Sequence, residues 1–384
     1  MFTINSIITT SLFLLTLLPL NAQPSQFCQS TNVANITTAT AAPSPIRSIT
    51  PSLLTCPVAD IATTLTIPTF KICLRPASEQ DLISITIKDL GIWEPINTAR
   101  IVNLFLLQKS TAAPGAGGSE KQVVIDIGAH LGWYTLLAAS HGFSVVAFEP
   151  IRAQRERLEA SVLLNGFETL VTIMPYAVSN KFGFSTMWTS LDFQVVIESG
   201  QKTHTNSNSG GSWIRPKGWT TEEASEYAQV SEIGVETVLL DHTLNALNLL
   251  NDDDDKNEIF LIKIDIEGHL GLALSGGQQT IKHATFLFLE ITPKIEAVNG
   301  CNVTIIMNYL YHQGFRMCYS SRPKCDGNED ECNVDQRIND EKEACLDQLP
   351  NERRRDDDND DGRGEGEEWM YEDVLLAKIA APSQ

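Results

Sequence analysis

The run Val-Val-Ile-Asp126-Ile-Gly128-Ala-His130-Leu-Gly132 decides the fold of this chain. It completes an apolar stretch, Lys121 to Ile127, that is typical of a strand buried on both faces of a parallel sheet. The two glycines permit a tight turn in which the backbone can approach a ligand closely. A helix is expected directly after the second glycine. The run therefore predicts the strand, turn and helix that open an α/β domain.

A second apolar strand, Ser144 to Phe148, is followed by Glu149, which lies 23 residues after Asp126. Such a βαβ unit is typical of nucleoside binding, in which the acid after the second strand accepts the ribose hydroxyls. The glycine spacing is G-x-x-x-G after an acid, not G-x-G-x-x-G. S-adenosylmethionine (SAM) has a cationic end and no pyrophosphate, so this spacing favours SAM over a dinucleotide. The predicted cofactor-binding residues are Asp126, Gly128, His130, Gly132 and Glu149.

Length and charge limit the classes of function. The chain has 384 residues, 42% of them hydrophobic, and a formal net charge of −20. This is enough for one large domain with additional segments. The negative charge would repel phosphates, so nucleic acid is not expected as a partner.

The composition divides the chain into three regions. Residues 1–22 hold an apolar stretch of signal-peptide length that ends in a small-residue cleavage site. Residues 23–69 are rich in Thr, Ser, Pro and Ala, as in a flexible stalk or linker. Residues 70–380 form the expected α/β domain, with loop insertions at about 189–230 and 320–368.

Cysteine usage agrees with an N-terminal leader. Eight cysteines behind a signal peptide indicate disulfides formed in an oxidising compartment. The last four are expected to bridge one another locally: Cys318, Cys325, Cys332 and Cys345. Glycosylation sequons begin at Asn35 and Asn302. The protein is therefore expected to be a secreted or luminal glycoprotein, or, if the N-terminal segment stays uncleaved, to be anchored to a membrane.

Strand and helix patterns alternate along the expected domain. The alternation of Leu82 to Lys88 predicts a strand, and the motif from Gly91 to Pro95 opens a helix that runs to about Lys109. Further strands are expected at 170–179, 232–240, 259–265, 284–291, 314–318 and 373–378, and helices at 133–139, 151–164, 241–250 and 303–313. This order predicts a doubly wound, mostly parallel seven-stranded sheet, Rossmann-like, as in class I SAM methyltransferases.

Several motifs resemble those of the FkbM-type methyltransferases, in order and at plausible spacing, from about Phe70 to Ile379. They are Ser84 to Glu94, Asp126 to Thr135, Phe148 to Pro150, Ala177 to Ser179, Leu239 to Asp241, Ile262 to Gly268 and Leu287 to Glu290. The resemblance implies SAM-dependent methyl transfer to a hydroxyl oxygen of a macrolide or sugar. One departure is Leu270, where the family often has a second acid.

Four polar residues mark a candidate catalytic cluster at the end of a buried strand. Lys263, Asp265 and Glu267 alternate, so they share one face, and His269 follows. Buried charges are costly without partners, so the cluster is either catalytic or a structural group of ion pairs. In the catalytic interpretation Glu267 or Asp265 orients and deprotonates a hydroxyl, Lys263 keeps a carboxylate charged, and His269 is the alternative base. No metal-ligand spacing is present, and this scheme requires no metal.

The sequence thus favours a SAM-dependent O-methyltransferase that acts on a hydroxylated small molecule or a glycan. The alternative is a non-catalytic secreted binding protein that retains the methyltransferase fold. The intact acids and glycines of the cofactor motif argue against this alternative. A nicotinamide-dependent oxidoreductase is disfavoured by the glycine spacing.

Overall fold

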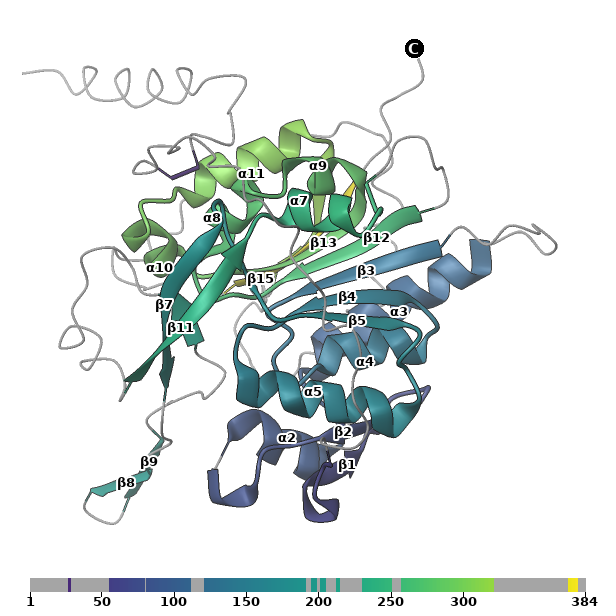
Figure 1. The fold of residues 1–384 in the computed structure, drawn as a ribbon, viewed down its shortest axis with the longest axis vertical. Helices are drawn as coiled ribbons and strands as arrows, with labels where there is room; N and C mark the ends of the chain where they lie inside the picture. Colours follow the sequence, from purple (N-terminus) through teal and green to yellow (C-terminus); the bar gives the residue numbers. More distant parts are fainter. Residues whose placement is uncertain are drawn as a thin grey trace, which may run out of the picture.

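A twisted seven-stranded sheet organises the protein (Figure 1). The computed structural model describes residues 27–28, 55–79, 81–111, 121–190, 195–198, 201–204, 212–214, 230–250, 257–320 and 372–378. In spatial order the strands are β14 (Phe315–Ser320), β15 (Glu372–Lys378), β13 (Ala284–Ile291), β12 (Asn257–Ile264), β3 (Lys121–Ile127), β4 (Ser144–Phe148) and β5 (Val171–Met174). The predicted seven-stranded sheet is confirmed.

The strand order fixes where a ligand can bind. Strands β5, β4, β3, β12 and β13 run parallel, whereas β15 is antiparallel to both of its neighbours, β13 and β14. The chain winds outward from β3 to β4 and β5, and later returns to the other side of β3 with β12. This reversal is the topological switch point, where ligands of open α/β sheets bind at the carboxyl ends of the strands.

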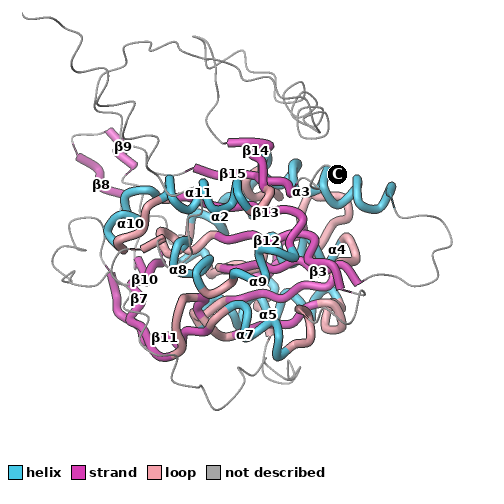
Figure 2. Tube along the Cα trace, turned by 90° about the horizontal axis from the view of Figure 1, so that it is seen from above, coloured by secondary structure: helices cyan, strands magenta, loops and turns pink. Residues whose placement is uncertain are grey.

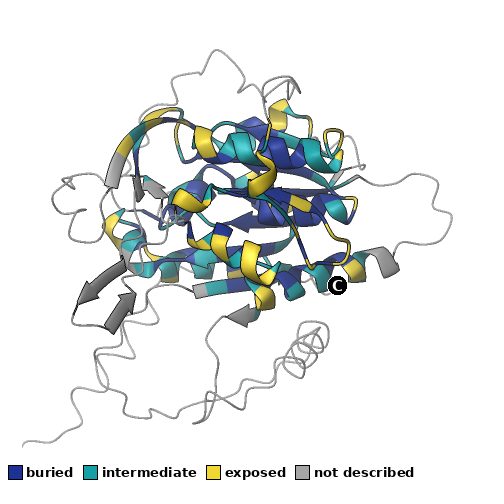
Figure 3. Ribbon diagram, turned by 90° about the horizontal axis from the view of Figure 1, so that it is seen from below, coloured by how far each residue is buried: buried dark blue, intermediate teal, exposed yellow. Residues whose placement is uncertain are grey.

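Helices cover both faces of the sheet, in two layers that Figures 1 and 2 show from different directions. One layer contains α3 (Pro95–Thr111), α4 (Trp133–Ser140) and α5 (Arg152–Asn165). The other contains α7 (Leu240–Ala246), α8 (Leu270–Ser275), α9 (Gln278–His283), α10 (Pro293–Val298) and α11 (Val303–His312). Each layer packs its own apolar cluster against the strands, and Figure 3 shows the buried strands between partly exposed helices.

The expected strand at Leu82 to Lys88 is wrong, because this segment forms helix α2 (Leu82–Leu90). Asp81 caps the helix by accepting a hydrogen bond from the Ser84 backbone N–H at 2.8 Å. Gly91, in the left-handed conformation, ends it. Ser84 and Ile87 are buried three residues apart, so the segment is covered on one helical face. Alternating isoleucines imitated a strand pattern within a capped helix.

Ordered structure extends upstream of the expected domain boundary at Phe70. Strand β1 (Ile61–Thr63), preceded by the 3-10 turn η3 (Val58–Asp60), pairs with β2 (Lys71–Cys73) as an antiparallel hairpin. A disulfide joins Cys56 to Cys73. The 3-10 turn η4 (Ala77–Glu79) leads from the hairpin to α2.

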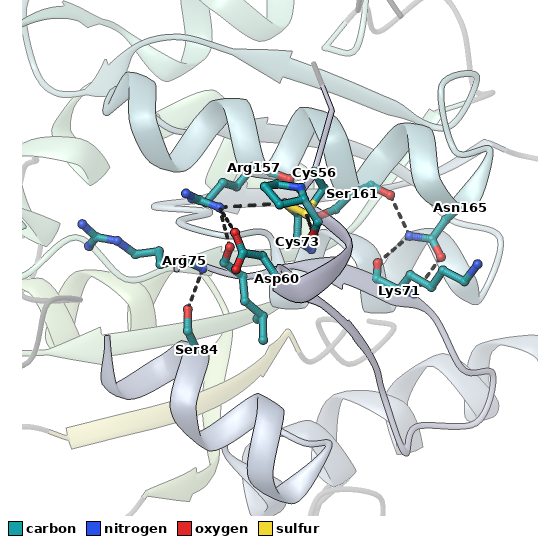
Figure 4. The surroundings of a disulfide bond; sticks show 11 residues. Cys56, Asp60, Lys71, Cys73, Arg75, Ser84, Arg157, Ser161 and Asn165 are labelled. Carbon is teal, nitrogen blue, oxygen red and sulfur yellow. Dashed lines mark hydrogen bonds and ion pairs between the residues drawn. A yellow bond between two sulfur atoms is a disulfide. The ribbon is translucent and has the colours of Figure 1, made fainter. Parts of the chain in front are cut away.

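The hairpin is fixed to helix α5, as Figure 4 shows. The Cys73 backbone N–H donates to Ser161 Oγ at 2.8 Å, and the Asn165 side chain bonds both the N–H and the carbonyl of Lys71. Arg157 donates to the carbonyl of Leu74. Side chains of α5 thus bond the backbone N–H and carbonyl groups along the outer edge of β2. This contact positions the helices that follow the hairpin over the sheet.

A second sheet of four strands is formed by residues that follow β5 in the chain. Its order is β10 (Ser212–Ile214), β7 (Gly183–Ser190), β11 (Val230–Val238) and β6 (Ala177–Val178). The single strand expected at 170–179 is therefore wrong: it divides into β5 and β6, which belong to different sheets. The expected irregular loop at 189–230 contains β10 and the hairpin of β8 (Val195–Glu198) and β9 (Gln201–His204), and its remaining residues lie largely outside the described ranges.

A second disulfide joins Cys28 to Cys301, so the described residues Phe27 and Cys28 are attached to the helix layer that contains α10 and α11. Phe27 is fully buried, packs edge-on against Tyr309, and its carbonyl accepts the Asn302 N–H at 2.8 Å. Cys318 is also disulfide-bonded. Its expected partners lie outside the described residues: Cys325, Cys332 and Cys345.

The N-terminal and insertion predictions are only partly covered by the structure. Residues 1–26, 29–54 and 321–371 lie outside the described ranges, so the signal peptide, most of the stalk and the charged insertion remain predictions. Among the helices that are described, none has the length and apolar character needed to cross a membrane.

Removing the long-range disulfide should destabilise the fold. The Cys28→Ser, Cys301→Ser double variant should lose about 2–5 kcal/mol of unfolding free energy, because the bridge closes a loop spanning 273 residues. Cys56→Ser with Cys73→Ser is the matched control, with a smaller expected loss because its separation is 17 residues. Denaturant titration measures both. Wild-type stability in the Cys28 and Cys301 variant, or labelling of these thiols in the denatured native protein, would contradict the expectation.

Candidate cofactor and active site

A pocket opens at the carboxyl ends of β4, β3, β12 and β13, where the strand order reverses. Its volume is about 860 Å³, counting the part open to solvent. Apolar residues line the side of β5 and the second sheet: Ile151, Tyr176, Met187 and Ile214. Acids line the side of β12 and β13: Glu94, Asp265, Glu267 and Glu290.

Glu149 lies in the pocket at the end of β4, as the sequence predicts. Its Oε2 accepts the His130 backbone N–H at 2.8 Å, and its Oε1 accepts the Ile151 N–H at 2.7 Å. Burial raises the pKa of Glu149 to about 7, although these two backbone hydrogen bonds act in the opposite direction. The two backbone N–H groups thus hold the carboxylate in one orientation. They thereby also fix the directions of its remaining lone pairs.

The two glycines of the opening motif serve different contacts. Gly128 lines the pocket with φ 81°, and an added Cβ would lie 1.9 Å from the Asp265 carbonyl oxygen. Gly132, with φ 91°, does not line the pocket, and an added Cβ would instead meet the Leu158 side chain at 2.2 Å. The first glycine lets β3 approach the loop after β12, and the second lets α4 approach α5.

Lys263 connects the ends of β3 and β12. Its Nζ lies 3.1 Å from Asp265 Oδ2 and 3.6 Å from Asp126 Oδ1, and it donates to the Gly128 carbonyl at 3.0 Å. Burial lowers the pKa of Lys263, but the two carboxylates outweigh burial and raise it. Asp126 is fully buried and accepts a hydrogen bond from Thr135 Oγ1 at 2.6 Å. Neither Lys263 nor Asp126 lines the pocket, so both lie behind its wall.

Three carboxylates gather in front of this lysine. One oxygen each of Asp265, Glu267 and Glu290 lies within 4.8 Å of the others. Burial, followed by the charge of Asp265, raises the pKa of Glu267 to about 8 and raises that of Glu290 well above its usual range. A divalent cation accepts such oxygen ligands. Protons and Lys263 also neutralise the group, so the expectation of metal-independent chemistry stays a prediction.

The two predicted histidines occupy different environments. His269 is buried, and its Nε2 lies 3.0 Å from Ser179 Oγ. His130, at the tip of the glycine turn, has φ 52° and a buried Nε2 that has no hydrogen-bond partner among the described residues. Burial lowers the pKa of each ring to about 4. Both rings are therefore neutral at physiological pH, and both line the pocket.

Helix α10 braces the turn that carries Glu267. Glu296 is buried and accepts the backbone N–H groups of Leu270 at 2.6 Å and Gly271 at 3.2 Å. Asn299 Nδ2 donates to the Gly268 carbonyl at 2.7 Å. Glu267 itself has φ 50°, a conformation that a non-glycine residue adopts only when its surroundings enforce it. Position 270 contributes its backbone to this brace, so leucine is tolerated there.

Sequence reasoning missed part of the pocket wall. Ile83, Trp93 and Glu94 come from α2 and the loop before α3, and none of them was a predicted site residue. Met187 and Ile214 come from the second sheet. The only local signal was the position of Glu94 within the upstream motif, just before Pro95. The remaining contacts arise from long-range packing, which no local pattern shows.

Comparison with known proteins identifies the family. The model of the Methyltransferase FkbM domain matches residues 126–317, half of the chain. The chain belongs to the FkbM methyltransferase family. It is therefore a SAM-dependent methyltransferase, and the recognition made from its motifs is confirmed. No curated protein matches the sequence.

Solved structures of other methyltransferases share coarse features with this FkbM protein. A presumed RNA methyltransferase from Pyrococcus horikoshii is 8% identical, with 73% of this chain and 82% of the other covered and a TM-score of 0.30. A presumed sarcosine dimethylglycine methyltransferase from Galdieria sulphuraria is 9% identical, with 74% and 91% covered and a TM-score of 0.30. A presumed SAM-dependent methyltransferase from Listeria monocytogenes is 10% identical, with 75% and 100% covered and a TM-score of 0.31.

The pocket of this FkbM methyltransferase fits SAM. Glu149, a carboxylate fixed by backbone groups, would accept the ribose hydroxyls, and the apolar lining residues Tyr176 and Met187 would hold the adenine ring. His130, whose buried Nε2 has no hydrogen-bond partner among the described residues, lines the same pocket and donates its backbone N–H to Glu149. The acids at the other side complement the cationic methionine portion.

Removing the charge of Glu149 should weaken SAM binding. The Glu149→Gln variant should bind SAM about tenfold to a hundredfold more weakly, since hydrogen bonds to a charged group contribute roughly 1.5–3 kcal/mol. Glutamine keeps the side-chain volume and one oxygen for the backbone N–H groups. Titration calorimetry measures the affinity, and Glu156→Gln on the exposed face of α5 is the matched control. Unchanged affinity in Glu149→Gln would contradict the ribose assignment.

Proposed function

We propose that this enzyme transfers the methyl group of SAM to a hydroxyl oxygen of a carbohydrate or another hydroxylated small molecule in the secretory pathway. The observation that carries the proposal is Glu267, a carboxylate with a pKa raised to about 8 by burial, on the acidic side of the SAM pocket. A hydroxyl is a poor nucleophile until its proton is accepted, and a base with a pKa near the working pH is suited to that task.

The residues of the pocket perform the chemistry by alignment and proton transfer. SAM, when bound, supplies a methyl group on a positively charged sulfur that a nucleophile displaces in line. Glu267 accepts the hydroxyl proton as the new C–O bond forms and the C–S bond breaks. Asp265, kept charged by Lys263 at 3.1 Å, orients the hydroxyl. His269 is neutral and hydrogen-bonded to Ser179, which makes it the alternative base.

The secretory part of the proposal is supported by the cysteines and the N-terminus. Five described cysteines are disulfide-bonded, and none of the described cysteines is free. Such bonds persist in oxidising compartments. Asn302 of the second sequon is exposed, where a glycan can be attached. With the signal-like residues 1–22, these features support acceptors of the secretory pathway, of which glycans are abundant hydroxylated examples.

Identifying the acceptor tests the proposal directly. We expect labelled methyl transfer from SAM to at least one member of a panel of glycans and small hydroxylated molecules, with the label in an alkali-stable ether. Glu267→Gln should lower kcat at saturating SAM by about 10²–10⁴-fold, the contribution of a general base, with SAM affinity retained. The same measurement on Asp265→Asn and His269→Ala shows how much each of these two residues contributes to kcat as a base. Transfer of the label to nitrogen or carbon instead, or near-normal rates in all three variants, would contradict the proposal.

The pH dependence of kcat provides a separate test. A general base must be deprotonated, so kcat should rise with pH through about 8, the pKa of Glu267, and level off above it. Measurement at saturating SAM separates this rise from the titration of Glu149. The rise should disappear in Glu267→Gln. The Glu156→Gln variant changes a residue that does not line the pocket, so it should keep the wild-type profile. A flat profile in the wild type would assign the base elsewhere.

A further inference from the structure

One acid of the pocket comes from a part of the chain that the family match does not cover. Glu94 lies in the loop between α2 and α3, upstream of residues 126–317, and lines the pocket together with Trp93. The hairpin docked on α5 and the capped helix α2 bring this loop over the carboxyl ends of the strands. The N-terminal segment thus completes the pocket wall.

Glu94 is held in a fixed orientation. Its Oε2 accepts hydrogen bonds from the Tyr134 hydroxyl at 2.6 Å and from Asn97 Nδ2 at 3.4 Å. Trp133 Nε1 donates to Thr98 Oγ1 at 2.9 Å, which ties the first turn of α3, directly after this loop, to the start of α4. Glu94 has φ 41°, so its backbone is held in a conformation that the surroundings must enforce. Within the described part of the chain both hydrogen bonds end on Oε2, which leaves Oε1 as the oxygen for a ligand.

The position of Glu94 matches the methionine portion of SAM. Tyr134 places it beside Lys263, whose Nζ lies 5.6 Å from the Tyr134 ring centre, and hence near the end of β12. Glu149 is at the end of β4, and β3 lies between β4 and β12. The spacing of neighbouring strands puts the ends of β4 and β12 about 10 Å apart. A SAM molecule with its ribose on Glu149 and its chain over Gly128 extends toward this point.

The neighbouring acids are engaged elsewhere. Asp126 lies behind the pocket wall and pairs with Lys263. Asp265 is neutralised by the same lysine at 3.1 Å. Glu267 lies within 4.8 Å of Asp265 and is the proposed base. Among the described acids of the pocket, Glu94 and Glu149 lie outside this group and are fixed by neutral donors, and Glu149 is already assigned to the ribose.

We propose that the Glu94 carboxylate binds the α-ammonium group of the methionine portion of SAM. Burial raises the pKa of Glu94 in the free protein, and a cationic partner would restore its charged form. The inference rests on the proposed ribose contact of Glu149, which orients the cofactor. It assigns to the N-terminal segment a direct role in cofactor binding, beyond the residues that the glycine motif predicts.

Two thioether ligands distinguish the contact to the ammonium group from the contacts to the nucleoside. S-adenosylhomocysteine carries the ammonium group, whereas 5′-methylthioadenosine lacks the amino-acid portion and keeps the nucleoside and a neutral sulfur. By calorimetry, Glu94→Gln should weaken S-adenosylhomocysteine about tenfold or more, and 5′-methylthioadenosine by less than about twofold. Glu149→Gln should weaken both ligands, and Glu156→Gln neither. Tyr134→Phe, which frees the Glu94 side chain, should give a smaller loss that is also confined to S-adenosylhomocysteine.

The outcomes separate this inference from the proposed site. Equal weakening of both ligands in Glu94→Gln, or no weakening, would overturn the ammonium contact. No effect of Glu149→Gln on either ligand would instead overturn the ribose contact that orients SAM. If Glu94→Gln does not fold, the test is made on the wild-type protein, by comparing its affinity for S-adenosylhomocysteine with its affinity for the des-amino analogue. Binding of this analogue as tight as that of S-adenosylhomocysteine overturns the inference, and binding at least about tenfold weaker supports it.

Discussion

The buried contact set of Lys263 is the interaction on which the site depends. The lysine bonds Asp126 and the Gly128 carbonyl at the end of β3, and Asp265 after β12. These two strands are neighbours at the point where the sheet order reverses, so the contacts fix the floor of the pocket. A buried ion pair adds little net stability, but removing one partner leaves an uncompensated charge and is costly. The lysine therefore specifies geometry more than it adds stability.

Around this floor, three separate regions supply the walls. The N-terminal hairpin and α2 place Trp93 and Glu94, the second sheet places Met187 and Ile214, and α10 holds the turn of Glu267. The Cys28–Cys301 disulfide packs beside this last region, since an added Cβ at Gly271 would lie about 3 Å from both sulfurs. The candidate cofactor-binding and catalytic residues thus line one pocket at the carboxyl ends of parallel strands.

Most of the sheet was predictable because its strands are apolar runs bounded by polar turns. β3, β4 and β13 lie where the sequence places them, residue for residue. The failures have local causes. Leu82 to Leu90 alternates like a strand, but caps at Asp81 and Gly91 make it a helix. The run at 170–179 is mostly apolar, yet its last residues join another sheet. Gly132 fits a cofactor motif, although it serves helix packing.

The sequence by itself determined the order of most elements, the family and the position of Glu149 directly after the second strand of the sheet domain. Each of these depends on short-range patterns: the glycine turn, the acid at the end of the next strand and the apolar periods. Only the tertiary structure decided that Asp126 lies behind the wall, that Glu94 enters the pocket and that Glu290 joins Asp265 and Glu267. These relations join residues far apart in the chain, and they depend on strand pairing and burial, which local periodicity does not encode.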